Sequence, residues 1–385
     1  MATPEGLPAT VRLKVLGSAP IELSFVEEGP ELFLVASDPT ALWARESVRA
    51  PVDVLHADGR VETRIAWPIS DPTRAEEVLS AFRRKYGEAA WERYFRGRTR
   101  VLALRETSSR SHRPTEEVLR AEFDAVADRY TDAVEHNPFA RYLRERSEGR
   151  FRRLFERRDP ILELGPGTGI ETLALLRQGH RVVAVDISSR MLAELRHRVD
   201  SAGLSENLHT RLGSIGNLGE VLGDLAPGSF GGALSTFGSL NLEPHLDRLP
   251  AALTRLLAPG APFFAGILNR WGLIPAAYLL LAGHPRVAAR RLRSPIVTGG
   301  FLCPLEIQSY TGREFAKGFR PGFVLERTEA ASVLTPPYWS PPLFGFWSDA
   351  GRNSFARLDG VVSGRVLFRE LGEYLFVTLR RTTGK

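Results

Sequence analysis

Two acidic residues and a run of glycines lie close together along the chain, in a pattern that could bind a nucleoside. The apolar run 161–164 contains Glu163, and Asp186 ends a second apolar run. Between them stand three glycines at alternate positions, Gly165, Gly167 and Gly169. Glycines let the backbone approach a ligand closely, and a helix expected over 170–178 offers unpaired N–H groups at its start. Because a carboxylate at a strand end can accept hydrogen bonds from ribose hydroxyls, the pattern predicts a βαβ unit with a nucleoside site.

The spacing of the glycines decides between nucleotides. A dinucleotide site requires G-x-G-x-x-G/A, but Ile170 follows the third glycine, and no Lys-Ser/Thr pair follows that would bind a triphosphate. Glu163 stands two residues before the first glycine, where a carboxylate would repel a pyrophosphate and attract a cationic ligand. The alternative is an ordinary βαβ turn that binds nothing.

The whole segment resembles motif I of the class I S-adenosylmethionine-dependent methyltransferases. The pattern E-x-G-x-G-x-G carries the likeness, and the run from Asp186 to Leu192 is similar to the family's D-x-S-x-x-M-L step from strand to helix. The resemblance covers about residues 116–385 and implies S-adenosyl-L-methionine as the cofactor. It places Asp186 on the ribose, Ile187 and Met191 beside the adenine, and Glu163 with the glycine backbone near the methionine end.

Two later positions extend this resemblance. Many relatives end their third strand with Gly-Asp, whose acid bonds the adenine amine, whereas this chain has Gly213-Ser214. Ser214 could make one hydrogen bond there or belong to a simple loop. The segment 235–241 is similar to the pattern S-x-F-G-x-L-N, which lies around the methionine moiety and the sulfonium. Phe237 and Asn241 are therefore candidate cofactor contacts, although Phe237 could equally belong to the core.

A tyrosine ahead of the sheet is a further candidate. Residues 123–130 are similar to the family pattern F-D-x-x-A-x-x-Y, whose tyrosine covers the methionine part of the cofactor. This likeness implies that Tyr130 binds the cofactor, and the alternative is an amphipathic helix with a half-buried tyrosine.

The sequence assigns no catalytic residue and no metal site. Methyl transfer asks mainly for alignment and the exclusion of water, so a base is needed only if the acceptor is protonated. Glu243 and His245 could supply one, but a lone histidine is more often a surface residue. The loop 334–339 looks like the D/N-P-P-Y loop of enzymes that methylate a nucleobase nitrogen. Because Thr335 replaces the acid or amide, we interpret this loop as a lid or lining segment.

Alternating strand and helix patterns must position these residues. Strands are expected at 160–164, 181–185, 208–212, 231–236, 262–268, 323–333 and 374–380. Strands that alternate with helices form a parallel sheet covered on both faces. The predicted fold of residues 116–385 is therefore α/β, a Rossmann-like sheet of seven strands that is mostly parallel, with an antiparallel pair formed by the last two strands.

The N-terminal part is expected to be rich in strands. They are predicted at 11–16, 21–27, 31–36, 52–56, 60–68 and 99–104, with a helix over 72–86. Strands around a single helix suggest a small barrel, and about residues 10–105 resemble the split-barrel proteins related to pyridoxamine-phosphate oxidase and deazaflavin-dependent nitroreductases. The resemblance implies a flavin or deazaflavin, but Gly17–Pro20 lacks the basic residue that would hold its phosphate. Trp43, Trp67 and Trp91 are interpreted as barrel core.

Three parts follow from these patterns. Residues 1–106 form the split-barrel domain, 107–115 a polar linker, and 116–385 the methyltransferase domain. Thr115 is expected to cap the helix that begins the second domain. The barrel could instead serve as a dimerisation module, which would make the protein a homodimer, or as a cover over the substrate.

Composition limits the compartment and the partners. A net charge of +6 and a pI near 9.7 suggest nucleic acid, but the arginines are scattered and not interleaved with aromatic residues, so nucleic acid is an unfavoured partner. The longest apolar stretch, 273–282, is too short for a bilayer, and nothing near Met1 resembles a secretory signal. Cys303 is the only cysteine, which fits a reducing cytosol. We therefore predict a cytoplasmic enzyme without a membrane partner.

The predicted function is S-adenosylmethionine-dependent methyl transfer to a small molecule whose identity the sequence does not disclose. Three alternatives stay open: a fusion whose barrel binds a flavin or deazaflavin for redox chemistry, a sensor that binds the cofactor without turnover, and a nucleic-acid methyltransferase. The last predicts binding that weakens steeply with salt.

Overall fold

The computed structural model describes most of the chain. The described residues are 10–15, 21–29, 31–36, 51–56, 60–69, 72–96, 100–106, 115–128, 130–131, 138–281, 285, 288–289, 292, 294–299, 304–333, 358–365 and 368–383. The chain divides into two compact units, one built mainly from residues 1–112 and the other mainly from 113–385. Of the predicted linker 107–115, only Thr115 is described, and the loop 334–339, Trp43 and Gly17–Pro20 lie outside the described residues.

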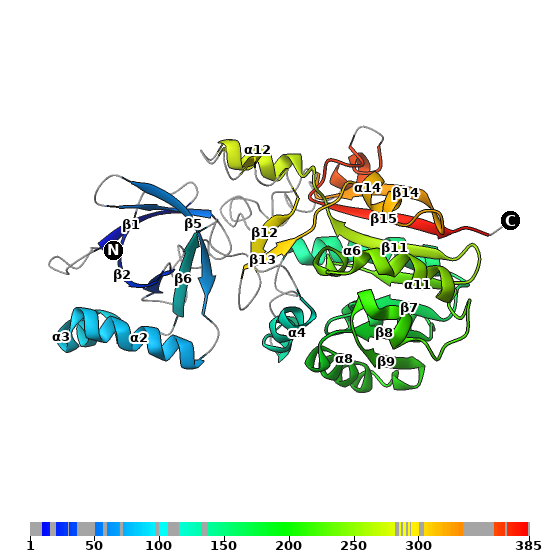
Figure 1. The fold of residues 1–385 in the computed structure, drawn as a ribbon, viewed down its shortest axis with the longest axis horizontal. Helices are drawn as coiled ribbons and strands as arrows, with labels where there is room; N and C mark the ends of the chain where they lie inside the picture. Colours follow the sequence, from blue (N-terminus) through cyan, green and yellow to red (C-terminus); the bar gives the residue numbers. More distant parts are fainter. Residues whose placement is uncertain are drawn as a thin grey trace. The chain divides into compact units, whose positions relative to one another are not determined.

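The first unit is an antiparallel barrel. Its strands are β1 (Thr10–Val15), β2 (Ile21–Glu28), β3 (Glu31–Ala36), β4 (Pro51–Leu55), β5 (Val61–Pro68) and β6 (Arg100–Glu106). They close in the order β1-β2-β3-β6-β5-β4 (Figure 1). The predicted strands and the helix α2 (Pro72–Tyr86) agree with these bounds to within one or two residues. Two short helical segments, α3 (Glu88–Ala90) and η1 (Trp91–Phe95), were not predicted.

Strand alternation gives the barrel two apolar faces. Leu32 and Leu34 belong to a cluster made of strand residues alone, while Phe33 and Val35 belong to a cluster shared with α2 and η1. Trp91 lies in that second cluster, 8% exposed, which agrees with its interpretation as core. The side chain of Trp67 is not among those described.

The second unit is built on a sheet of seven strands. They are β7 (Ile161–Leu164), β8 (Val182–Asp186), β9 (Leu208–Leu212), β10 (Gly232–Ser235), β11 (Pro262–Leu268), β14 (Phe323–Ala331) and β15 (Tyr374–Arg381), in the order β14-β15-β11-β10-β7-β8-β9 (Figure 1). Strands β7 to β11 are parallel, and β15 runs antiparallel to both β11 and β14. The predicted α/β sheet with its antiparallel pair is confirmed. The two-stranded sheet of β12 (Ile296–Gly299) and β13 (Pro304–Ile307) was not predicted.

The helices of the second unit connect its strands, and the side chains of Thr115, Ser188 and Thr311 each cap the start of one of the described helices. Their bounds are α4 (Glu116–Asp124), α6 (Pro138–Phe155), α7 (Ile170–Arg177), α8 (Ser189–Ser201), α9 (Leu218–Val221), α10 (Ser239–Leu242), α11 (Leu249–Leu256), α12 (Leu273–Leu281) and α14 (Gly312–Gly318), with short turns η2 (Ser205–Asn207), η3 (Ile215–Asn217) and η4 (Leu246–Arg248). Thr115 accepts the N–H of Val118 at 3.2 Å, which confirms it as the N-cap of α4. No helix among the described residues is long and apolar enough to cross a bilayer.

The strand order creates a crevice at one edge of the sheet. From β7 the chain proceeds outward through β8 to β9, then returns to β10 on the other side of β7 and proceeds to β11. Crossovers between parallel strands are right-handed, so reversing the direction places the following helices on the opposite face. The loops after β7 and β10 therefore diverge, and ligands of open α/β sheets bind at such a point.

Candidate cofactor site

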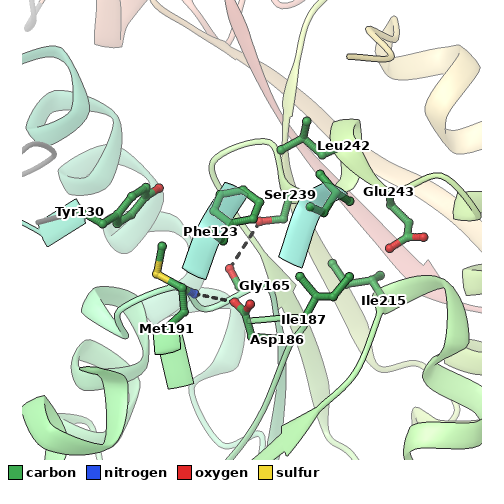
Figure 2. A pocket seen from close by; sticks show the side chains of 12 residues that line it. Phe123, Tyr130, Gly165, Asp186, Ile187, Met191, Ile215, Ser239, Leu242 and Glu243 are labelled. Atoms are coloured by element: carbon green, nitrogen blue, oxygen red, sulfur yellow. Dashed lines mark hydrogen bonds between the residues drawn. The ribbon is translucent and has the colours of Figure 1, made fainter. Parts of the chain in front are cut away.

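A cavity lies at this crevice, beyond the carboxyl ends of β7, β8 and β10. It encloses about 560 Å³ of space between atoms, its open mouth included. Its lining is mostly apolar with a few polar side chains, and consists of Leu119, Phe123, Tyr130, Gly165, Gly167, Asp186, Ile187, Met191, Ile215, Ser239, Leu242 and Glu243 (Figure 2). Six of these residues were predicted as cofactor contacts: Tyr130, Gly165, Gly167, Asp186, Ile187 and Met191.

The three glycines after β7 serve different purposes. All have positive φ, between 56° and 80°, a region that only glycine enters without strain. A Cβ on Gly165 would lie 2.5 Å from the hydroxyl of Ser239, so the missing side chain admits the start of α10 (Figure 2). Gly167 faces the cavity, where the nearest neighbour of a Cβ would be the Tyr130 ring at 3.8 Å. Gly169 is the N-cap of α7 and packs against Leu195 instead of lining the cavity.

Asp186 provides a buried carboxylate at the tip of β8. Its Oδ2 accepts the N–H of Gly167 at 3.0 Å, and its Oδ1 accepts the N–H of Ser188 at 2.9 Å. Burial raises the pKa of this carboxyl to about 6, against the lowering effect of those backbone hydrogen bonds. Since a carboxylate has about four acceptor positions, Asp186 retains capacity toward the cavity.

Glu163 lies beneath the cavity and not in its lining. Its carboxyl accepts the hydroxyl of Thr172, on α7, at 2.7 Å, and the residue is 2% exposed. Burial raises its pKa to about 8, so the group is largely protonated at neutral pH. The predicted direct attraction of a cationic ligand therefore does not follow from this geometry, because the side chain points to α7.

Ser214 also lies outside the lining. Its hydroxyl accepts the N–H of Gly216 at 3.2 Å and donates to Glu243 at 3.1 Å. The next residue, Ile215, contacts the cavity instead. Ser214 thus positions a neighbouring carboxylate, whereas the sequence left open a hydrogen bond to the adenine or a role in a simple loop.

Phe237 and Asn241 are not part of the cavity lining. Phe237 has a φ of 57°, and the Arg144 guanidinium lies 4.2 Å from its ring centre. Asn241 is 1% exposed, and its amide donates to the carbonyl of Gln308 at 2.6 Å and accepts the N–H of Leu268 at 2.8 Å. Asn241 therefore links α10 to Gln308 and to Leu268 at the end of β11. Ser239, from the same segment, is the residue that lines the cavity.

Several lining residues were missed as cofactor contacts. Leu119 and Phe123 are four residues apart on α4, the spacing of neighbours on one helix face, and Phe123 begins the quoted pattern that ends at Tyr130. That spacing could have identified them. Leu242 and Glu243, at the end of α10, carry no such signal, and Glu243 was considered only as a base.

A known family model matches part of the second unit. Residues 161–260 match the family model described as "Methyltransferase domain". The matched residues begin at β7 with its glycine turn and end just before β11.

Curated relatives match the chain over a short stretch. Dimethyladenosine transferase of Kluyveromyces lactis is 46% identical over 55 residues, 14% of this chain and 17% of that protein. The probable dimethyladenosine transferase of Dictyostelium discoideum is 42% identical over 55 residues, 14% of this chain and 18% of that protein. The match therefore spans less than a fifth of the length of these relatives.

Solved structures resemble the chain over more of its length but less closely. The cyclase SpnF has a TM-score of 0.47 at 16% identity, covering 71% of this chain and all of that chain (100%). The 1,6-didemethyltoxoflavin-N1-methyltransferase of Burkholderia thailandensis has a TM-score of 0.44 at 19% identity, covering 73% of this chain and 95% of that one. Both TM-scores lie below 0.5.

Proposed function

We propose that this protein is an S-adenosylmethionine-dependent methyltransferase that acts on a small molecule. One observation above all supports this: the buried Asp186 carboxylate and the Gly165–Gly167 turn face one cavity at the crevice of the sheet. The cofactor, when bound, supplies a methyl group on a positively charged sulfur that is already activated for transfer.

The residues of the cavity fit the parts of this cofactor. Asp186 has acceptor positions left for the two ribose hydroxyls, which a carboxylate at a strand tip binds well. Ile187 and Ile215 provide an apolar slot suited to an aromatic base. Gly167 and Tyr130 form the opposite end, where backbone and an aromatic ring can face a cation.

Catalysis in such a site comes from positioning and desolvation. The cavity wall is largely apolar, formed by side chains such as Phe123 and Leu242, which excludes water from the reacting groups. Alignment of acceptor and methyl donor can supply much of the rate without a protein base. We assign no general base.

The small-molecule acceptor is favoured over nucleic acid by the sequence. Thr335 replaces the acid or amide that amino-methylating enzymes place before Pro-Pro-Tyr. The competing function rests on the net charge of +6 and on the names of the relatives that match 55 residues. The flavin or deazaflavin of the barrel stays a prediction, and so does a homodimer formed through it.

Calorimetry on the full chain tests the proposal. S-adenosylmethionine and S-adenosylhomocysteine should each bind one site, and NAD should not compete, because the spacing of Gly165, Gly167 and Gly169 differs from the G-x-G-x-x-G/A pattern of a dinucleotide site. No heat with either sulfur compound would sink the proposal, and so would displacement by NAD.

A second measurement separates the two acceptor classes. For a small-molecule enzyme, binding of a structured RNA should be weak and should vanish by physiological salt. If specific RNA binding persists, with a steep dependence on salt concentration, the nucleic-acid function is correct instead.

A further inference from the structure

The cavity contains a second buried carboxylate that the cofactor assignment leaves unused. Glu243, directly after α10, is 7% exposed and lines the same cavity as Asp186. In Figure 2, Ile187 and Ile215 lie between the two acids, and Tyr130 lies at the opposite end. If Asp186 holds the ribose, a base extending along the two isoleucines reaches Glu243.

The surrounding structure holds this carboxylate in place. Ser214 donates its hydroxyl proton to Oε2 at 3.1 Å, and the N–H of His245 donates to Oε1 at 3.0 Å. A Cβ on Gly216 would lie 2.5 Å from Oε1, so the absence of a side chain there lets the acid approach the turn η3. These two donors use about half of the acceptor positions of a carboxylate.

The remaining acceptor positions of the Glu243 carboxylate determine which purine base the cavity can bind. Among the lining residues only Tyr130, Asp186, Ser239 and Glu243 have polar side chains, and Glu243 is the one at the isoleucine end. An ionised carboxylate only accepts hydrogen bonds. It therefore suits the exocyclic amine of adenine and opposes the carbonyl oxygen that hypoxanthine or guanine carries at the same position.

We propose that Glu243 is the specificity residue for the base, accepting a hydrogen bond from the adenine amine while Ser214 positions its carboxylate. This inference rests on the proposed function and assigns the purine end of the same site. The proposal also explains why Ser214 can stand after β9 where many relatives have an acid. Ser214 donates its only hydroxyl proton to Glu243, and Glu243, which follows α10, supplies the carboxylate that binds the base.

A ligand pair tests the proposal on the unmodified protein. S-adenosylhomocysteine has an amine at position 6 of the base and an acceptor at N1, whereas S-inosylhomocysteine has a carbonyl at position 6 and an N1–H. Calorimetry with the full chain should give at least tenfold tighter binding of the adenine compound. Equal affinity for the two would overturn the inference while leaving the methyltransferase proposal standing, whereas binding of neither would remove the proposed function itself.

Variants locate the preference in the side chain. Glu243→Gln should weaken S-adenosylhomocysteine about tenfold and reduce the preference to threefold or less, because an amide can donate as well as accept. Ser214→Ala should reduce the preference partly, since it removes only the positioning contact. Glu220→Gln, an exposed acid on α9, is the matched control and should change neither affinity.

The same variants distinguish the competing role as a base. If Glu243→Gln lowers methyl transfer but keeps the wild-type ratio of the two affinities, Glu243 serves the acceptor and the inference is wrong. Circular dichroism establishes that each variant is folded; should Glu243→Gln fail to fold, the ligand pair on the wild type and Ser214→Ala still decide.

Discussion

Replacing Asp186 by asparagine removes the charge at the centre of the site while keeping its shape. In the wild type, both carboxylate oxygens accept backbone N–H groups, from Gly167 and from Ser188. The asparagine amide has one oxygen, so one backbone N–H would face an NH₂ group and lose its partner. The same loss applies to the ribose hydroxyls, which would meet a donor where they need an acceptor.

The magnitude follows from the hydrogen bonds at stake. A hydrogen bond to a charged group contributes about 1.5–3 kcal/mol. Losing one such ribose bond and weakening the second costs binding about 3 kcal/mol, which corresponds to roughly 100-fold in the dissociation constant. We expect this loss for S-adenosylhomocysteine with Asp186→Asn at pH 7.5, where the wild-type carboxyl, with a pKa of about 6, is ionised.

Calorimetry at pH 7.5 with S-adenosylhomocysteine measures the change. Asp224→Asn is the matched control, because Asp224 is an exposed acid paired with Arg211 outside the cavity lining. That variant should bind as tightly as the wild type. A folded Asp186→Asn protein that binds within threefold of the wild type would refute the assignment of Asp186 to the ribose.

Three further predictions concern pH and packing. Affinity for S-adenosylhomocysteine should fall as pH falls through about 6, because protonated Asp186 loses its charge; titration between pH 5 and 8 checks this, and an unchanged affinity contradicts it. In the folded protein Glu163 keeps its proton up to about pH 8, whereas in the unfolded chain it loses the proton at lower pH. The free energy of unfolding of the wild type should therefore fall as pH rises from about 5 to 8, by up to about 1.4 kcal/mol per pH unit. Thermal unfolding at several pH values checks this, and Glu163→Gln should lack that dependence on pH. Gly169→Ala should lower the free energy of unfolding, measured with urea, by about 2–4 kcal/mol, because the new Cβ would lie 2.6 Å from Leu195. Gly179 has a similar φ but no atom within 4 Å of such a Cβ, so Gly179→Ala should show only the cost of a positive φ for alanine. Equal losses in the two variants would count against a clash at Leu195.

Much of the second unit could be predicted because its central strands β7, β10 and β11 are buried on both faces. Strand β11 is buried along its whole length, and such runs bounded by turns are easily recognised in a sequence. The pair β12 and β13 was not predicted: Gly299 ends one of its short strands and Pro304 begins the other, and both residue types are turn signals in a sequence.

The sequence predicts the site residues whose positions are set by the turn after β7 or by the end of β8. It does not predict those whose side-chain direction depends on packing in the folded chain. Asp186 and Gly167 line the cavity because the turn and the strand end place them there. Glu163 stands in an equally suggestive position, yet its side chain is directed to Thr172, and no spacing rule reports which side of the strand end an acid faces. Glu243 contributes through a turn that only the folded chain brings beside Ser214.

Part of the cavity wall comes from residues that precede the seven-stranded sheet in the sequence. Leu119, Phe123 and Tyr130 all precede residue 161, where the match to the methyltransferase domain begins. A chain trimmed to 161–260 would keep Gly165, Gly167 and Asp186 but would lose these three side chains, so the cavity would be open on one side. The match to residues 161–260 therefore does not determine the full shape of the cavity, because part of its wall comes from residues that precede the matched segment.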